Sequence, residues 1–369
     1  MNQENQDPLF TIIIDVFWRL DLFKPGIESV LLQSYKNLEI VVINNGASND
    51  ISDFIKEISL SDKRLKILEF NENHFSWEDP GSSLKYILNE ALKLKVTGKY
   101  VLYKSFDDLL SENYVQSMVN LFKENSSCTT ALGRPISMHD NGIDQFELED
   151  KEINIRPRYM SGKDLVIDYL NEGNLYNMPG GMLTLKTTDL INAGGWDRQT
   201  DLCHFLRILP FGVVGTDNNA FLYWRRHSDQ LNKKLNAKGY VGALGTYSLI
   251  EDTDLKERWD KLGEGLTKTL ISFMTRSQLK TSAQWFILNL FHFRFKSIFI
   301  TLSEEKFNLL FLAFLPKYVW LFKLVFLVSF IKIFRPLLRP IFLYVDKLIP
   351  SLKGRSILFS RALSFLIKG

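Results

Sequence analysis

Residues 98–110 read GKYVLYKSFDDLL, an apolar run of strand character that ends abruptly in two adjacent carboxylates, Asp107 and Asp108. Neighbouring carboxylates repel each other unless a positive group lies beside them, and a hard divalent cation is a common partner. A plain structural role also suits them, in which Asp107 caps a helix starting near Ser111 and Asp108 is solvated. The pair alone therefore leaves a metal site and a helix cap both open.

Strand character recurs three times before this stretch, over residues 9–15, 37–46 and 64–70. Apolar residues at helical spacing follow each of these strands, and the first helix is expected to open at Pro25 and Gly26. Alternation of strand and helix predicts an α/β fold, with a mostly parallel sheet covered by helices on both faces.

Two polar turns follow the carboxyl ends of these strands, one at Asn44 and Asn45 and the other at residues 105–108. Ligands bind open α/β sheets at this edge, so these turns are where we expect a nucleotide. The Asn-Asn-Gly sequence also suits an ordinary tight turn, because Asn and Gly tolerate positive φ.

Past the acidic turn the pattern loosens. We expect a hairpin-and-loop insertion over 134–162, then a short strand, a helix and a Gly-Gly break over 177–197. An amphipathic helix is expected over 200–212, a last strand with a basic end over 219–227, and helices from about 231 onward.

Charge and aromatic residues are segregated along the chain. Residues 281–369 contain 13 Lys and Arg against 3 Asp and Glu, whereas the whole chain has a formal net charge of +3, so the remainder is acidic. The basic residues of this tail are embedded among Phe, Leu and Ile, which favours an anionic membrane surface over nucleic acid as its partner.

The apolar segment 307–334 is interrupted by Lys317, Lys323 and Lys332, and by Pro316. No charge-free span of 18 residues remains, so we expect an in-plane or shallowly re-entrant helix with snorkelling lysines. The alternative is a soluble helical dimerisation domain with a Phe-rich core, which would make the protein a homodimer.

Cys128 and Cys203 show neither a pairing pattern nor metal-ligand spacing, which fits a reducing compartment. The N-terminal sequence MNQENQDPLF is polar and acidic rather than basic and then apolar, unlike a signal peptide. With the basic tail, these features predict a location on the cytoplasmic side of the cell membrane.

Taken in order, these segments resemble the family 2 glycosyltransferases, which have a GT-A fold and transfer a sugar from a nucleotide donor with inversion. FTIIID at 10–15 resembles the first strand of the family, and residues 27–48 resemble its helix, second strand and base-binding turn. GKYVLYKSFDDLL resembles the strand that carries the metal-binding acids.

The second half of the resemblance lies on the acceptor side. INAGGWD at 191–197 and TDLCHFLR at 200–207 resemble the acceptor-side element and the helix with the catalytic acid, and residues 223–232 resemble the basic segment that closes the site. The chain is thus expected to comprise a GT-A domain at 1–230 and an all-helical, basic and aromatic-rich region at 231–369.

The resemblance also implies roles for individual residues. Asp201 would be the general base, although the family usually has Glu-Asp here and this chain has Thr200 before it. A Mg²⁺ or Mn²⁺ ion would be bound by Asp107, Asp108 and His227.

The remaining implied roles concern the donor and the acceptor. The nucleotide-binding residues would be Phe17, Asn44, Asn45, Ser105, Arg225 and Arg226, and the acceptor-side residues would be Gly194, Gly195, Trp196 and Asp197. Ser105 stands where the family frequently has an Asp, and the two Asn stand where it frequently has acids, so the charge of the site is reduced.

The sequence therefore predicts an inverting glycosyltransferase with a nucleotide-diphosphate donor, a UDP-sugar first and a thymidine donor second. Its acceptor would be a lipid-linked glycan or a growing bacterial surface polysaccharide, as the membrane-seeking tail suggests. The acids missing at Asn44, Asn45, Ser105 and Thr200 keep a second interpretation open, a weak or inactive GT-A module that acts as a membrane-bound scaffold.

Overall fold

The structure is a computed structural model of the chain, and it describes residues 7–76, 80–140, 146–150, 155–172, 183–197, 206–230 and 252–273. These residues belong to one compact α/β unit built around a ten-stranded sheet. Within these ranges, no helix is long and apolar enough to cross a membrane. The expected membrane-associated helices of the tail lie outside the described residues.

Four parallel strands in the order β3-β2-β1-β4 form one side of the sheet. They are β1 (Phe10–Val16), β2 (Leu38–Asn45), β3 (Leu65–Phe70) and β4 (Tyr100–Ser105). The connecting helices are α1 (Leu20–Leu31), α2 (Asn49–Ser61) and α3 (Pro80–Leu94). Because every connection carries a helix, the four strands run in the same direction and their carboxyl ends share one edge.

The sheet continues from β4 through mixed pairings in the order β9-β6-β10-β5, while β7 pairs with β6 and β8 pairs with β10. These strands are β5 (Leu109–Leu110), β6 (Cys128–Asp140), β7 (Phe146–Glu149), β8 (Tyr159–Ser161), β9 (Thr184–Lys186) and β10 (Val213–Arg226). The remaining helices are α4 (Tyr114–Glu124), α5 (Gly162–Glu172), α6 (Thr187–Asn192) and α10 (Thr253–Asp260), with a 3₁₀ turn at Leu209–Phe211.

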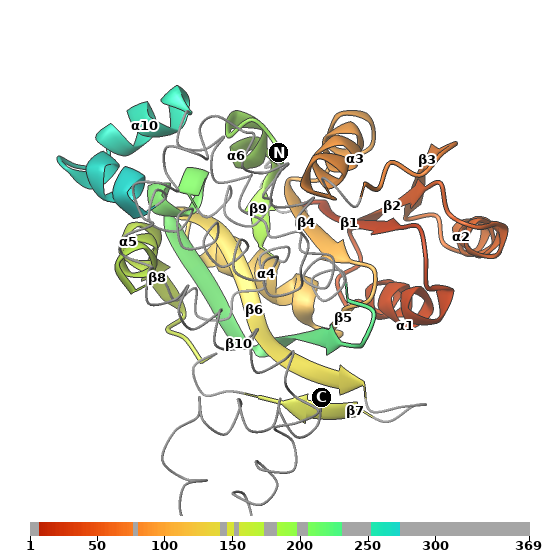
Figure 1. Cartoon of the computed structure of the whole chain (residues 1–369). Helices are drawn as coiled ribbons and strands as arrows, with labels where there is room; N and C mark the ends of the chain where they lie inside the picture. The colour runs from red at the N-terminus through yellow and green to blue at the C-terminus, as the bar shows by residue number, and fades with distance from the viewer. Residues whose placement is uncertain are drawn as a thin grey trace, which may run out of the picture. The chain divides into compact units, whose positions relative to one another are not determined.

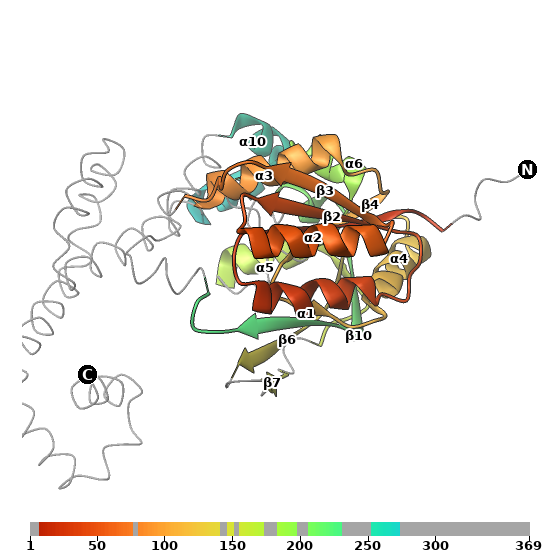
Figure 2. The ribbon, with the colours of Figure 1, turned by 90° about the vertical axis from the view of Figure 1, so that its right-hand side faces the viewer.

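Helices cover the two faces of this sheet (Figures 1 and 2), and a hydrophobic layer lies beneath the helices on each face. Helices α1, α2 and α4 pack on one face, and α3, α5, α6 and α10 contribute to the core on the other. Trp259 of α10 is buried in the second layer, and its Nε1 donates to the carbonyl of Leu206 at 2.8 Å. Residues after 230 thus contribute to the core of this unit.

The predicted α/β fold with helices on both faces of the sheet is confirmed. The parallel pairing holds for β3-β2-β1-β4, but the sheet as a whole is mixed, because β5, β7, β8 and β9 all pair antiparallel with their neighbours. The helix after β1 begins at Leu20 rather than at Pro25, which lies inside it. Gly26 does not open the helix. A Cβ at this position would lie 1.9 Å from the carbonyl oxygen of Phe106, so only glycine fits here. Its lack of a side chain lets α1 approach the backbone of the acidic turn.

Two further boundaries differ from the sequence prediction. The last strand, β10, begins at Val213 rather than at residue 219, since it pairs over its length with β6. The expected hairpin is present as β6 and β7, which pair antiparallel. The division of the chain at residue 230 stays a prediction.

Candidate functional site

A pocket of about 150 Å³ opens at the carboxyl ends of β1, β2 and β4. Its polar lining residues include Asp15, Asn45, Ser105, Asp107 and His227. The pocket lies at the sheet edge where the sequence predicted a ligand site, because parallel strands bring their carboxyl ends together.

Alternation along the strands decides which polar side chains reach this pocket. Ile13 and Ile43 both pack in the core layer beneath α3. Side chains two residues further along each strand project on the same face, so Asp15 and Asn45 point toward the α3 side, where they line the pocket.

Asn44 projects on the opposite face and is committed to the turn. Its Oδ1 accepts from the backbone N–H of Ala47 at 3.0 Å, and its Nδ2 donates to Ser52 Oγ at 3.0 Å. The side chain does not line the pocket. The expected base contact by Asn44 is therefore replaced by a local turn role, for which short amide side chains are well suited.

Asn45 is the amide that the structure brings to the pocket. Its Oδ1 accepts from the backbone N–H of His74 at 3.0 Å, which holds the segment after β3 beside β2. Its Nδ2 has no hydrogen-bond partner among the described residues, so this donor is available to a carbonyl oxygen of a ligand.

Phe17 lies at the centre of an aromatic wall in the same pocket. Its ring stacks against Phe75 with centroids 5.1 Å apart and against Trp18 with centroids 5.8 Å apart. All three residues line the pocket. Phe75 comes from the segment between β3 and α3, which the sequence analysis did not connect with the site.

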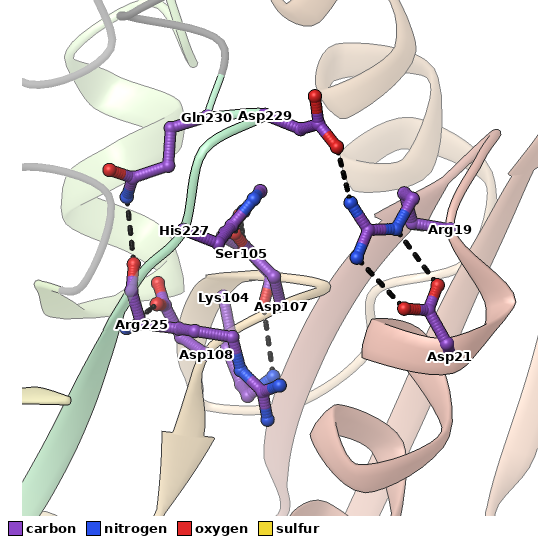
Figure 3. Close-up of polar contacts among 10 residues, drawn as sticks. All are labelled: Arg19, Asp21, Lys104, Ser105, Asp107, Asp108, Arg225, His227, Asp229 and Gln230. Carbon is purple, nitrogen blue, oxygen red and sulfur yellow. Dashed lines mark hydrogen bonds and ion pairs between the residues drawn. The ribbon is translucent and has the colours of Figure 1, made fainter. Parts of the chain in front are cut away.

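Asp107 is the carboxylate of the acidic turn that lines the pocket (Figure 3). Its Oδ1 accepts from Ser105 Oγ at 2.6 Å, and its Oδ2 lies 3.0 Å from His227 Nε2. Burial opposes ionisation, but the hydrogen bonds from His227 and Ser105 outweigh it and hold the pKa of Asp107 below its ordinary value. A negative charge is thus maintained at this end of the pocket.

Asp108 points away from the pocket. Its Oδ1 accepts from the backbone N–H of Arg225 at 2.9 Å, and only 4% of the residue is exposed. Burial, followed by repulsion from Asp107, raises the pKa of Asp108. The structure therefore does not join Asp108 with Asp107 and His227 as one set of ligands, since the backbone of β10 occupies its carboxylate.

Lys104 lies fully buried on the same side of the sheet edge as Asp108. Its Nζ donates to the backbone carbonyl of Ser105 at 2.9 Å. Burial lowers the pKa of Lys104, whereas the nearby charges of Asp108 and Asp107 act to raise it. This cation, which the sequence analysis did not single out, partly compensates the charge beneath the acidic turn.

The basic residues at the end of β10 differ in their positions: one lies at the pocket and two do not. His227 lines the pocket, but Arg225 and Arg226 do not. The carbonyl of Arg225 accepts from Gln230 Nε2 at 2.7 Å, and the guanidinium of Arg226 stacks over the ring of Trp224 at 3.1 Å. The expected arginine contacts with a nucleotide are therefore absent from the pocket lining, and His227 is the basic group placed there.

Arg19 joins the start of α1 to the segment after β10 (Figure 3). It has a left-handed backbone, with φ at 59°. Its Nη1 donates to Asp229 at 2.7 Å, and its Nε and Nη2 donate to Asp21 at 2.9 and 2.8 Å. The connection between β1 and α1 is thereby tied to the segment that follows β10.

The predicted acceptor-side element packs against α3. Gly194 and Gly195 have φ of 87° and 77°, in the left-handed region that favours glycine. Trp196 is buried, and its backbone N–H and carbonyl bond to the Asn89 side chain at 2.9 and 2.8 Å. The element is thus anchored to the helix whose first turns line the pocket.

Asp197 ends this element and lies 3.2 Å from Lys85 of α3. None of the four acceptor-side residues lines the pocket itself. Asp201 and the segment around it lie outside the described residues, so its role as general base stays a prediction.

The described part of the chain contains no group of three or more His, Cys, Asp or Glu side chains that could hold a metal ion. Asp107 and His227 nevertheless lie side by side at the pocket. Mg²⁺ is commonly held by one or two carboxylates together with substrate phosphates and waters. This pair therefore fits a cation shared with a phosphate-bearing ligand, rather than a closed protein cage.

Besides Phe75, sequence reasoning also missed Asp15 and Tyr103 as site residues. Tyr103 Oη donates to Asp15 Oδ1 at 2.8 Å, and both line the pocket. The available signal was a carboxylate at the carboxyl end of an otherwise apolar strand, at a position where the resembled family tends to have Pro.

The four parallel strands β3-β2-β1-β4, their polar carboxyl edge and the acidic turn after β4 define the class of this protein as an α/β domain of GT-A type. Residues 11–184 match the model of glycosyl transferase family 2. This stretch, somewhat less than half of the chain, is thus similar to the family 2 glycosyltransferases.

Similar proteins agree with this assignment. An uncharacterised glycosyltransferase of Rickettsia bellii is 34% identical over 121 residues, which are 33% of this chain and 16% of that protein. Glycosyltransferase GlyA of Streptococcus pneumoniae is 30% identical over 112 residues, 30% of this chain and 15% of that protein. The matches therefore span less than a fifth of either relative.

The fold also has a counterpart among solved structures. The crystal structure of S. aureus TarS superposes with a TM-score of 0.50 at 12% identity, covering 82% of this chain and 50% of that chain. At this identity the likeness concerns the fold alone.

Proposed function

We propose that the chain is an inverting glycosyltransferase that takes its sugar from a nucleotide-diphosphate donor, with a UDP-sugar as the first choice. The observation that carries this proposal is the pocket at the carboxyl edge of β1, β2 and β4. It combines an aromatic wall at Phe17 with an amide at Asn45 and an acid–imidazole pair at Asp107 and His227. The cavity thus offers an aromatic surface suited to a base, an amide that can bind the base and a polar end suited to a diphosphate, which supports the proposal.

The base end of the pocket favours a pyrimidine. The aromatic wall offers an apolar surface beside a planar ring. The free amide N–H of Asn45 can donate to a ring carbonyl such as O4 of uracil. Thymine carries the same carbonyl, so a thymidine donor is the second choice.

The phosphate end of the pocket is built around Asp107. A divalent cation, Mg²⁺ or Mn²⁺, would be held by Asp107 and His227 and would supply neutralisation of the departing nucleotide diphosphate. Ser105 orients the Asp107 carboxylate through Oδ1, whereas the contact of His227 Nε2 with Oδ2 would give way to the cation. Asp201 is proposed as the base that accepts the proton of the acceptor hydroxyl.

The proposed acceptor is a lipid-linked glycan or a growing polysaccharide at the cytoplasmic side of the cell membrane. This part rests on the basic, Phe-rich composition of residues 281–369. Truncation after about residue 285 is expected to move the protein from the membrane fraction to the soluble fraction. Full-length protein that is already soluble would contradict membrane association.

The transferase proposal is tested by metal-dependent hydrolysis or transfer with a panel of nucleotide sugars. Asp107→Ala and Asp201→Asn are expected to abolish turnover, whereas Asp53→Ala, at an exposed acid on α2, is expected to leave it unchanged. Chelation of divalent metal should lower turnover of the wild type toward that of Asp107→Ala.

Two outcomes separate the proposals. No turnover, together with no stabilisation of the fold by any nucleotide, would overturn the enzyme and favour the scaffold interpretation. Turnover that survives Asp201→Asn would refute only the assignment of the base.

A further inference from the structure

Asp15 is a carboxylate in the pocket that the proposed chemistry has not yet used. In the parallel pairing of β1 with β4, Asp15 lies opposite Ser105. Residues opposite each other in a parallel pair project on the same face, so Asp15 lies beside a position that bears only a hydroxyl. An acid is thus present at this point of the sheet edge, but on the neighbouring strand.

The surroundings of Asp15 are those of a buried charge with little compensation. Only 7% of the residue is exposed, and burial raises the pKa of its carboxyl group to about 6. Among the described side chains, only Tyr103 donates a hydrogen bond to it, at Oδ1. No ion pair to Asp15 occurs in the described part of the chain, which leaves acceptor capacity on its carboxylate.

Its position along the two strands places Asp15 between the two ends of the pocket. It precedes Phe17 of the aromatic wall by two residues, and its partner Ser105 precedes Asp107 by two residues. All four line the same pocket. A ligand group that contacts Asp15 therefore lies between a ring on the wall and a phosphate near Asp107.

In a nucleotide, the group between base and phosphate is the ribose, whose hydroxyls donate hydrogen bonds. We propose that Asp15 is a specificity-determining residue that binds the ribose hydroxyls of the donor and selects ribonucleotides over 2′-deoxyribonucleotides. This inference rests on the proposed nucleotide-sugar function and narrows it, because thymidine donors are 2′-deoxyribonucleotides and would be disfavoured. A ligand without the 2′-hydroxyl leaves the buried carboxylate unpaired, and that cost produces the selectivity.

The test compares the affinities of UDP and 2′-deoxy-UDP for the full-length chain by calorimetry. Hydrogen bonds to charged groups are worth enough to predict about 10- to 100-fold weaker binding of 2′-deoxy-UDP to the wild type. Asp15→Ala is expected to weaken UDP binding and bring this ratio to about 1–2. Its effect on 2′-deoxy-UDP should be small.

Two variants guard against a purely structural effect. Asp15→Asn keeps the size of the side chain and is expected to lower the ratio partially, since a neutral acceptor binds hydroxyls more weakly. Tyr103→Phe leaves the carboxylate in place and should retain most of the selectivity. Asp53→Asn on α2 serves as a carboxylate control outside the pocket and should match the wild type.

The outcomes are distinguishable from failure of the proposed function. A UDP to 2′-deoxy-UDP ratio that stays at the wild-type value in folded Asp15→Ala and Asp15→Asn overturns the role of Asp15 while nucleotide binding stands. Failure of the wild type to bind either nucleotide overturns nucleotide binding, and the inference with it.

Discussion

Replacing Asp15 by Asn should stabilise the fold at neutral pH, even though it impairs the site. The carboxyl group of Asp15 has its pKa raised from 3.8 to about 6, chiefly by burial and against the hydrogen bond from Tyr103. The folded chain therefore binds this proton more tightly than the unfolded chain does. The stability it supplies is present at low pH and is lost as the pH rises from about 4 to about 6.

The magnitude follows from the size of the shift. A change from 3.8 to about 6 corresponds to about 3 kcal/mol of destabilisation at pH 7, at 1.36 kcal/mol for each pKa unit. At pH 4, close to the unfolded pKa, the same arithmetic leaves less than about 1 kcal/mol. Asn cannot ionise and can still accept from Tyr103, so Asp15→Asn should recover most of this free energy at pH 7 and little at pH 4.

The assay is urea unfolding at pH 4, 5, 6 and 7. Unfolding is monitored by the hydrogen exchange of peptides from β1 and β4. These peptides report on the sheet that holds Asp15 rather than on the tail. With an m-value of about 2–3 kcal/mol/M for a domain of this size, the midpoint should rise by about 1 M urea at pH 7.

Asp107→Asn provides a control of opposite sign. Its pKa is lowered in the folded chain despite burial, because His227 and Ser105 bond to the carboxylate. Removing that charge should give no stabilisation at pH 7. Equal midpoints for Asp15→Asn and wild type across the pH range, or a gain that is largest at pH 4, would refute the argument that Asp15 is a desolvated carboxylate.

Three further substitutions test how the site is built. Asn44→Ala should cost about 1–2 kcal/mol, because the partly buried N–H of Ala47 loses its acceptor, while nucleotide affinity measured by calorimetry stays unchanged. A loss of affinity greater than the loss of stability would return Asn44 to the base site. Gly26→Ala should lower the free energy of unfolding in urea by about 1–3 kcal/mol and weaken nucleotide binding, since the new Cβ would displace the acidic turn. If the variant is as stable as the wild type, α1 does not support that turn. Asn89→Ala removes both hydrogen bonds to the backbone of Trp196 and should lower the free energy of unfolding by about 2 kcal/mol. It should also lower the rate of transfer more than the rate of donor hydrolysis. Equal effects on both rates would argue against an acceptor-side role.

Much of the architecture could be predicted from local sequence. The apolar strands over residues 9–15, 37–46 and 64–70 and the acidic turn at residues 105–108 all lie where their patterns placed them. The apolar runs of β1 and β2 report burial on both faces, whereas the edge strand β3 is only partly buried. The helix boundary at Pro25 was missed because a single proline can be tolerated inside a helix when the surrounding packing favours it.

The site was predicted less completely, because it depends on which face and which neighbour a side chain meets. Asn44 and Asn45 are equivalent in composition, yet the strand alternation sends only Asn45 to the pocket. Asp107 and Asp108 are likewise adjacent in sequence, but only Asp108 accepts a hydrogen bond from the backbone N–H of Arg225.

The sequence by itself determined the order of strands and helices and the sheet edge at which the polar turns would gather. Only the tertiary structure decided that Asp107 meets His227 across 120 residues of chain, and that Asp15 stands opposite Ser105. The physical reason is that strand alternation is local, whereas the order and register of strands in a sheet are set by the packing of the whole unit. Where one strand lacks an acid, its neighbour can supply one, and such a replacement becomes visible only once the strands are paired.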